Sequence, residues 1–166
     1  MTSFDDLPAT SFLRVFAAPR DLTPHERDAL AHRVETFLAG WRSHENPAAG
    51  RFAVLHDRFL VVAADERVTA LSGCSKDALV GCVRAAGDAL GLELVHSPPI
   101  VFRGADGIRS VDRAEFGRLV DSGAVRADTP VFDTIVTTVG AYRDGGFEKP
   151  AAESWHARAW KLAPAV

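Results

Sequence analysis

Cysteine is scarce in this sequence of 166 residues: Cys74 and Cys82 are the only two. Two cysteines do not make the disulfide framework of a small secreted protein. If both lie on one helix, the step of eight residues from one to the other places their Cα atoms roughly 12 Å apart. A disulfide requires a separation below about 7 Å, so we expect free thiols. Free thiols are typical of reducing compartments, and we therefore predict a cytoplasmic protein.

Long apolar runs are absent as well, since no stretch approaches the ~20 apolar residues of a membrane helix. The first segment, Met1–Pro8, is polar and acidic, and it does not resemble a signal peptide. The formal net charge is -3 and both signs are mixed along the chain, unlike a basic nucleic-acid surface. The sequence therefore predicts neither membrane insertion nor nucleic-acid binding.

The residues that are present suit a globular protein, with 47% hydrophobic and 25% charged side chains. A chain of this length can bury most of its apolar surface in one core. We expect a single domain over residues 1-166, with a core at about 10-103 and a C-terminal extension at about 104-166.

Two stretches have the apolar period of amphipathic helices. The first begins at the capping sequence Thr23-Pro24-His25-Glu26 and is expected to end near His44, before Asn46-Pro47. The second is expected to use Ser75 as its N-cap and to end at Gly91.

Apolar and β-branched runs predict the strands. They are residues 12–16, 52–55, 59–64 and then either 92–95 or 100–103. The resulting order β-α-β-β-α-β is typical of the ferredoxin-like split sandwich, and we therefore predict an α+β fold with that core. The C-terminal extension should hold a helix at 112–120, a strand at 131–139 and a docked aromatic tail at 154–160.

In that topology, polar residues from distant parts of the sequence meet at one edge of the sheet. The first helix ends there with Trp41 and His44, the third strand delivers Asp65 and Glu66, and the second helix begins there beside Cys74. A thiol, an imidazole and a carboxylate together are the parts of a nucleophilic site. Cys74 would be the nucleophile, with a nearby His and carboxylate.

The assignment of roles in such a site leaves alternatives open. The base would be His44 or His156, and the residue that orients it would be Asp65 or Glu66. Histidine, cysteine and aspartate also bind zinc, but the sequence has no paired motif such as C-x-x-C or H-E-x-x-H. We therefore assign no metal and no cofactor.

The turn before the second helix supports a different hypothesis, the binding of an anion or a small molecule. It carries a glycine and two hydroxyls where the N–H groups of a helix start are free. The ligand-binding residues would be Ser72, Gly73, Ser75, Asp77, Trp41, Glu66 and His156.

Structural roles can explain the same side chains. Cysteine often packs at a tight turn, and histidine is favourable near a helix C-terminus. In this interpretation Cys74 is a packing residue, His44 favours the helix end, Ser75 and Asp77 are the N-cap and a first-turn acid, and Trp41 is a core anchor.

Several short motifs are distinctive. They are Leu7-Pro8, Trp41-Arg42-Ser43-His44, the strand from Phe59 to Asp65, Ser72-Gly73-Cys74-Ser75 followed by Asp77, Thr129 with Val131-Phe132, and Pro150 leading to Ser154-Trp155-His156. With these motifs the chain resembles, nearly end to end, a family of uncharacterised bacterial proteins of about this size that is common in Bacteroidetes. Lys76 departs from the family pattern, which has an apolar residue there, and Asp133-Thr134 stands where relatives are rich in asparagine.

Members of that family often carry the label ABC transporter ATPase, and the resemblance implies no established activity. A P-loop requires G-x-x-x-x-G-K-[ST], in which a glycine-rich loop holds the phosphates. The nearest string, Gly73-Cys74-Ser75-Lys76, lacks the first glycine and the loop length. We therefore exclude ATP hydrolysis by the P-loop mechanism.

Three classes of function stay open: a small-molecule, anion-binding or protein-interaction domain, a thiol-dependent enzyme, and a structural protein without small-molecule chemistry. We rank binding or interaction above catalysis. The partner is unidentified, and a homodimer is one form that the sequence allows.

Overall fold

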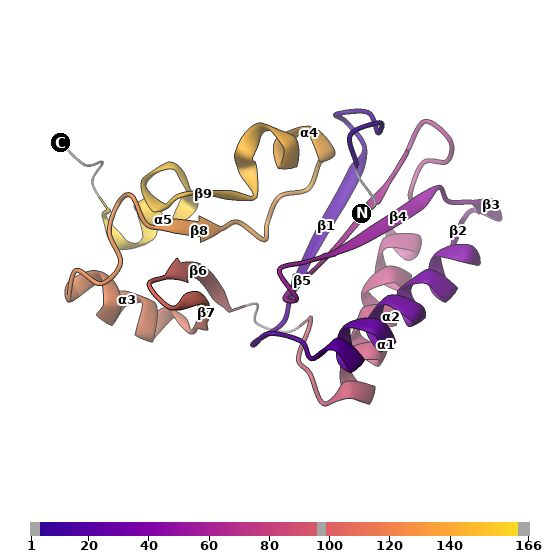
Figure 1. The fold of residues 1–166 in the computed structure, drawn as a ribbon. Coiled ribbons are helices and arrows are strands. Elements are labelled where there is room, and N and C mark those ends of the chain that lie inside the picture. The colour runs from indigo at the N-terminus through magenta and orange to yellow at the C-terminus, as the bar shows by residue number, and fades with distance from the viewer. Residues whose placement is uncertain (1–3, 96–98, 163–166) are drawn as a thin grey trace.

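The computed structural model describes residues 4–95 and 99–162 of the chain. Helices account for 38% and strands for 25% of the residues, which confirms the predicted α+β class. Two sheets form the centre of the molecule, each with its own helices (Figure 1). Within the described ranges, no helix is both long and apolar enough to cross a membrane.

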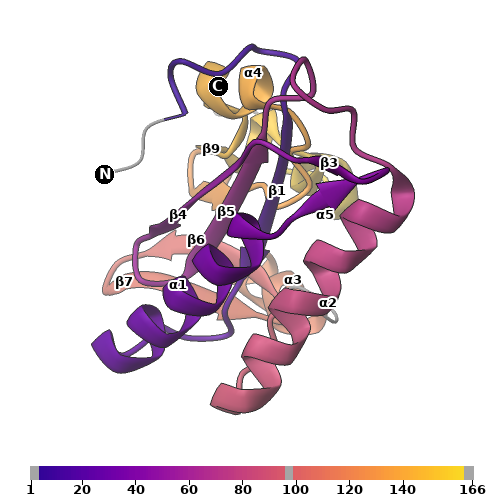
Figure 2. The ribbon, with the colours of Figure 1, turned by 90° about the vertical axis from the view of Figure 1, so that its right-hand side faces the viewer.

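The first sheet is antiparallel and has the strand order β1-β5-β4. Its strands are β1 (Phe12–Ala17), β4 (Gly50–Leu55) and β5 (Phe59–Ala64). Two helices, α1 (Pro24–Ala39) and α2 (Gly73–Leu90), lie side by side on one of its faces (Figure 2). All six residues of β5 are buried, as expected for a central strand that is covered on both faces.

The start of α1 is the predicted capping box. The Thr23 hydroxyl accepts a hydrogen bond from the Glu26 N–H, and the Glu26 carboxylate accepts one from the Thr23 N–H at 2.8 Å. Both contacts are local, so the sequence was sufficient to predict them.

The predicted end of this helix near His44 is wrong, because α1 ends at Ala39. The chain then forms a short hairpin of β2 (Arg42–Ser43) and β3 (Asn46–Pro47), in which His44 has a positive φ of 47°. Tertiary packing overrides the helical pattern here: the Trp41 indole is buried, and its Nε1–H donates to the Ser75 carbonyl at 2.9 Å.

The second helix begins earlier than predicted. Its N-cap is Ser72, whose hydroxyl accepts from the Ser75 N–H, so the prediction of Ser75 as N-cap is wrong. Ser75 lies inside the first turn, where its own hydroxyl donates to the Ser72 carbonyl at 2.8 Å. The predicted end is confirmed, since Gly91 has a left-handed φ of 66° that only glycine adopts without strain.

The second sheet contains four strands in the order β7-β6-β8-β9. They are β6 (Ile100–Gly104), β7 (Gly107–Val111), β8 (Pro130–Phe132) and β9 (Glu148–Pro150). The helices of this part are α3 (Arg113–Asp121), α4 (Val139–Ala141) and α5 (Trp155–Trp160), with the short turns η1 (Tyr142–Gly146) and η2 (Ala151–Glu153).

The two sheets share a core, because the face of the first sheet opposite the helices packs against the second. Phe59 of β5 lies with its ring centroid 4.8 Å from that of Phe132 and 5.1 Å from that of Phe147. Val61 and Val101 are fully buried in the same cluster.

The ferredoxin-like core is not confirmed, because neither predicted fourth strand lies in the first sheet. Residues 92–95 form no strand, and β6 belongs to the second sheet. On the side of β1 away from β5, the described residues form a single antiparallel bridge, between Phe12 and Thr138, and no strand. The predicted strand 131–139 is also too long: β8 ends at Phe132, and the Asp133 carboxylate then accepts from the Ile135 N–H in a turn.

Candidate functional site

The polar edge predicted from the sequence joins three elements through Ser43, a residue that the sequence analysis did not single out. The Ser43 hydroxyl donates to the Ala70 carbonyl at 2.7 Å and accepts from the Ser72 N–H at 2.9 Å. The Trp41 indole adds its bond to Ser75. The β2–β3 hairpin, the loop that follows β5 and the start of α2 therefore form one connected corner.

Both predicted carboxylates of this corner bind cations or backbone groups. Asp65 accepts two hydrogen bonds from the Arg67 guanidinium, at 3.1 and 2.8 Å, and this pairing lowers the pKa of its carboxyl. Glu66 accepts from the Leu71 N–H at 3.2 Å and lies 3.6 Å from the Lys76 ammonium. The structure therefore gives each carboxylate a partner other than an imidazole.

The two groups proposed for catalysis are accessible but unconnected. Cys74 is exposed in the first turn of α2. His44 lines a shallow hollow of about 600 Å³ together with Asn46 and Thr69. Within residues 4–95 and 99–162, neither side chain makes a hydrogen bond, and no group of three His, Cys, Asp or Glu side chains can hold a metal ion.

The residues predicted to bind an anion are in part used by the helix itself. The hydroxyls of Ser72 and Ser75 serve the helix cap and the Ser72 carbonyl. Asp77 and Gly73 are exposed, and a Cβ on Gly73 would meet nothing within 4 Å. Lys76 lies over the Phe12 ring at 5.1 Å from its centroid.

His156 lies in a different part of the molecule, on α5 behind the second sheet, whereas Cys74 begins α2 on the other side (Figure 1). Its side chain is only 1% exposed and packs on Phe116. Nδ1 contacts the Ser154 hydroxyl at 2.7 Å, while the buried Nε2 has no hydrogen-bond partner in the described part of the chain. Burial lowers the pKa of this imidazole to about 4. The structure therefore does not bring His156 to the predicted edge.

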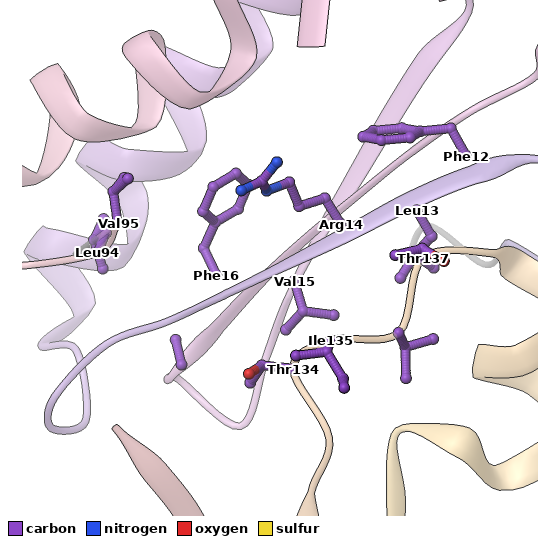
Figure 3. Close-up of a pocket in the computed structure, with 12 residues that line it drawn as sticks. Phe12, Leu13, Arg14, Val15, Phe16, Leu94, Val95, Thr134, Ile135 and Thr137 are labelled. Carbon is purple, nitrogen blue, oxygen red and sulfur yellow. The ribbon is translucent and has the colours of Figure 1, made fainter. Parts of the chain in front are cut away.

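A groove that the sequence analysis did not predict runs along the open side of β1. It has a volume of about 370 Å³ and is lined by Phe12–Ala17, Leu94, Val95 and Thr134–Thr137. In Figure 3, Arg14 and Phe16 project from one side of β1, and Val15 projects from the other side toward Ile135. The groove thus lies between the layer of α1 and α2 and the layer of the second sheet.

The backbone of β1 is only partly paired along this groove. The Leu13 N–H donates to the Thr137 carbonyl at 2.9 Å, and the Ser11 carbonyl accepts from the Val139 N–H at 3.0 Å. Because backbone groups alternate in direction along a strand, the N–H and carbonyl groups of Val15 and Ala17 point to the same side as those of Leu13. In the described ranges these two residues, which are 7% and 2% exposed, have no hydrogen-bond partner on that side, so the sheet edge is unpaired there.

The groove contains one cation. Arg14 is exposed, and its guanidinium carbon lies 5.5 Å from the Phe16 ring centroid. It forms no ion pair with any described carboxylate. On the opposite wall Ile135 is 64% exposed. A single arginine within the otherwise apolar run Phe12–Phe16 was the available sequence signal for this site.

Comparisons with known proteins add no constraint. No family model matches the sequence, and the searches of curated proteins and of solved structures returned no match either. The candidate site is therefore defined by geometry and chemistry alone.

Proposed function

We propose that this protein is an interaction domain that binds an extended peptide segment of a partner in the groove along β1. The observation that carries the proposal is that, within residues 4–95 and 99–162, the backbone of Val15 and Ala17 has no partner at this edge of the first sheet. An extended chain that lies beside such an edge gains backbone hydrogen bonds at every second residue. Side chains of the bound peptide, which contact the two walls of the groove alternately, then provide specificity.

The ferredoxin-like interpretation supports the same position for the ligand. In a split β-α-β-β-α-β sheet the fourth strand lies beside the first. Among the residues described here, that position holds the Phe12–Thr138 bridge with two flanking backbone bonds, but no strand. We therefore propose that the partner's peptide takes the place of this strand. The four residues Arg14–Ala17 offer about 14 Å of edge, enough for a segment of about four extended residues.

The side chains of the groove indicate the chemistry of the peptide. Arg14 favours an acidic side chain, because it has no carboxylate partner within the described residues. Phe16, Val95 and Ile135 favour apolar residues at the flanking positions. The proposed ligand is thus a short extended segment in which an acid is flanked by apolar residues.

Selection from a phage library of random 12-residue peptides tests the proposal. Wild-type protein should enrich peptides with this pattern, and Val15→Pro should not, because proline removes the outward N–H without removing an internal ladder bond. In fluorescence anisotropy, Arg14→Glu should weaken an enriched peptide at least about tenfold. Arg33→Glu, an exposed arginine of α1 away from the groove, is the matched control.

Two results would overturn the proposal. One is a library that yields no peptide enriched on wild-type protein above the Val15→Pro variant. The other is a set of peptides whose affinity for Arg14→Glu equals that for Arg33→Glu. Amide exchange gives a direct readout, since bound peptide should protect the Val15 and Ala17 amides.

Anion binding at Ser72–Ser75, thiol chemistry at Cys74, cytoplasmic location and the family resemblance stay predictions. We rank the groove above the first two for physical reasons. Ser72 and Ser75 use their hydroxyls within α2, and Cys74 has no imidazole partner in the described ranges. The groove instead combines apolar walls with backbone donors and a cation that have no partner in the part of the chain that the structure describes.

A further inference from the structure

The first sheet has a second open edge, on the outer side of β4. The strand order β1-β5-β4 places β4 at this edge. The Ala49 carbonyl accepts from the Asp65 N–H and the Leu55 carbonyl from the Arg58 N–H, so odd-numbered residues face β5. Phe52 and Val54 therefore direct their N–H and carbonyl groups outward. Among the described residues these four groups have no hydrogen-bond partner.

This edge is not covered by the neighbouring helix. All six residues of β4 are half-buried, and hollows of about 340 and 290 Å³ lie between α1 and β4. Natural proteins usually protect a bare edge with proline, a bulge or free charges. Within β4 the one charged residue is Arg51, and it is paired with Asp6 at 2.6 Å. The edge is thus straight, apolar and available for pairing.

The structure assigns a second copy of this chain to the edge, with the two β4 strands antiparallel about a two-fold axis at Ala53. In this register Phe52 lies opposite Val54 of the second copy, and the reverse pair forms by symmetry. Each pair exchanges two backbone hydrogen bonds, so all four outward groups on each strand find partners. The first sheet then continues as six strands across the dimer.

The charges on α1 favour the same antiparallel arrangement. Arg27 lines the hollow beside Val54 and Leu55, and Glu35 lines the hollow beside Gly50 and Arg51. The two charges therefore lie at opposite ends of the seam. A two-fold axis at its centre brings Glu35 of each copy toward Arg27 of the other. Arg27 also pairs with Asp57 at 3.1 Å and with Asp28 at 3.2 Å, whereas Glu35 has no ion pair within the described residues. A parallel arrangement would place like charges together instead.

The register is tested by a cysteine on the axis. In a background with Cys74→Ser and Cys82→Ala, the variant Ala53→Cys should form a disulfide-linked dimer on mild oxidation. Its Cα atoms would lie about 4.5 Å apart in a non-hydrogen-bonded pair, within the range of a disulfide. Arg51→Cys in the same background is the matched control, because its two copies would lie roughly 14 Å apart.

The dimer itself is tested on the unmodified protein by light scattering at about 100 µM. We expect a mass of about twice the 17.9 kDa of the chain. Glu35→Lys should raise the dissociation constant at least about tenfold. A monomeric mass for the wild type would overturn the inference. So would a dimer in which Ala53→Cys cross-links no faster than Arg51→Cys.

Discussion

At the scale of single residues, the two cysteines have different surroundings although both lie on α2. Cys74 is exposed in the first turn, whereas Cys82 is half-buried. Burial raises the pKa of the Cys82 thiol, and nearby Arg33 opposes this only in part. Because the thiolate is the reactive form, burial and pKa act in the same direction on Cys82.

We therefore expect iodoacetamide to alkylate Cys74 about tenfold faster than Cys82 in the native protein at pH 8. Mass spectrometry of the two cysteine-containing peptides against time provides the measurement. The denatured protein is the control, and there the two rates should be similar. Equal rates in the native state would show that the first turns of α2 open on the time scale of labelling.

At the scale of elements, most local signals were read correctly, although the N-cap of α2 is Ser72 and not Ser75, and long-range packing was not. The Thr23 capping box and the end of α2 at Gly91 depend on contacts within one turn, and both are as predicted. The end of α1 depends instead on the burial of Trp41 against α2. There its indole donates to the Ser75 carbonyl, which lies 34 positions away in the sequence. Hydrophobic period alone carries no information about such a contact.

The candidate site shows the same limit. His44 and Ser72 do reach one corner of the fold, through the hairpin and the start of α2. The groove along β1 escaped prediction because it arises where an expected strand is absent. An apolar run such as residues 92–95 has the composition of a strand, but its pairing is decided by the rest of the sheet.

Ser43 links the β2–β3 hairpin to α2, and its removal should destabilise that corner. Ser43→Ala deletes the bonds to the Ala70 carbonyl and the Ser72 N–H at a position that is 1% exposed. Leaving such groups without partners costs about 2 kcal/mol. Urea unfolding should show this loss, whereas the exposed Ser122→Ala should change stability by less than about 0.5 kcal/mol. If Ser43→Ala lowered the free energy of unfolding by as little as Ser122→Ala, water would have replaced the Ser43 hydroxyl.

At the scale of the whole molecule, the two open edges of the first sheet lie on opposite sides of β5. The groove along β1 faces the second sheet, while the edge of β4 lies beside α1. A peptide in the groove and a second copy at β4 therefore contact different surfaces. Consequently Glu35→Lys should leave the groove intact, so that the two proposals can fail independently.

The stability of the whole fold should depend on pH through His156, which is 1% exposed and packs on the rings of Phe116 and Trp155. Burial lowers the pKa of this imidazole to about 4; the charge of Asp133 opposes the shift, and Lys149 and Arg113 add to it. The unfolded chain, with a histidine pKa near 6.5, binds more protons than the folded protein between these values. The contribution of His156 to the free energy of unfolding is therefore fully present above about pH 6.5. It is lost as the pH drops toward 4, by about 3 kcal/mol.

Denaturant unfolding between pH 7 and pH 4.5 measures this dependence. In His156→Phe the titrating group is gone, so the loss of unfolding free energy across this range should be smaller than in the wild type by the contribution of one proton. His32→Gln replaces an exposed histidine and should leave the wild-type slope unchanged. The comparison also separates His156 from acidic groups such as Asp65, which titrate equally in all three proteins. If His156→Phe kept the full slope, the imidazole would be protonated in the folded state, and α5 would have to open to admit solvent.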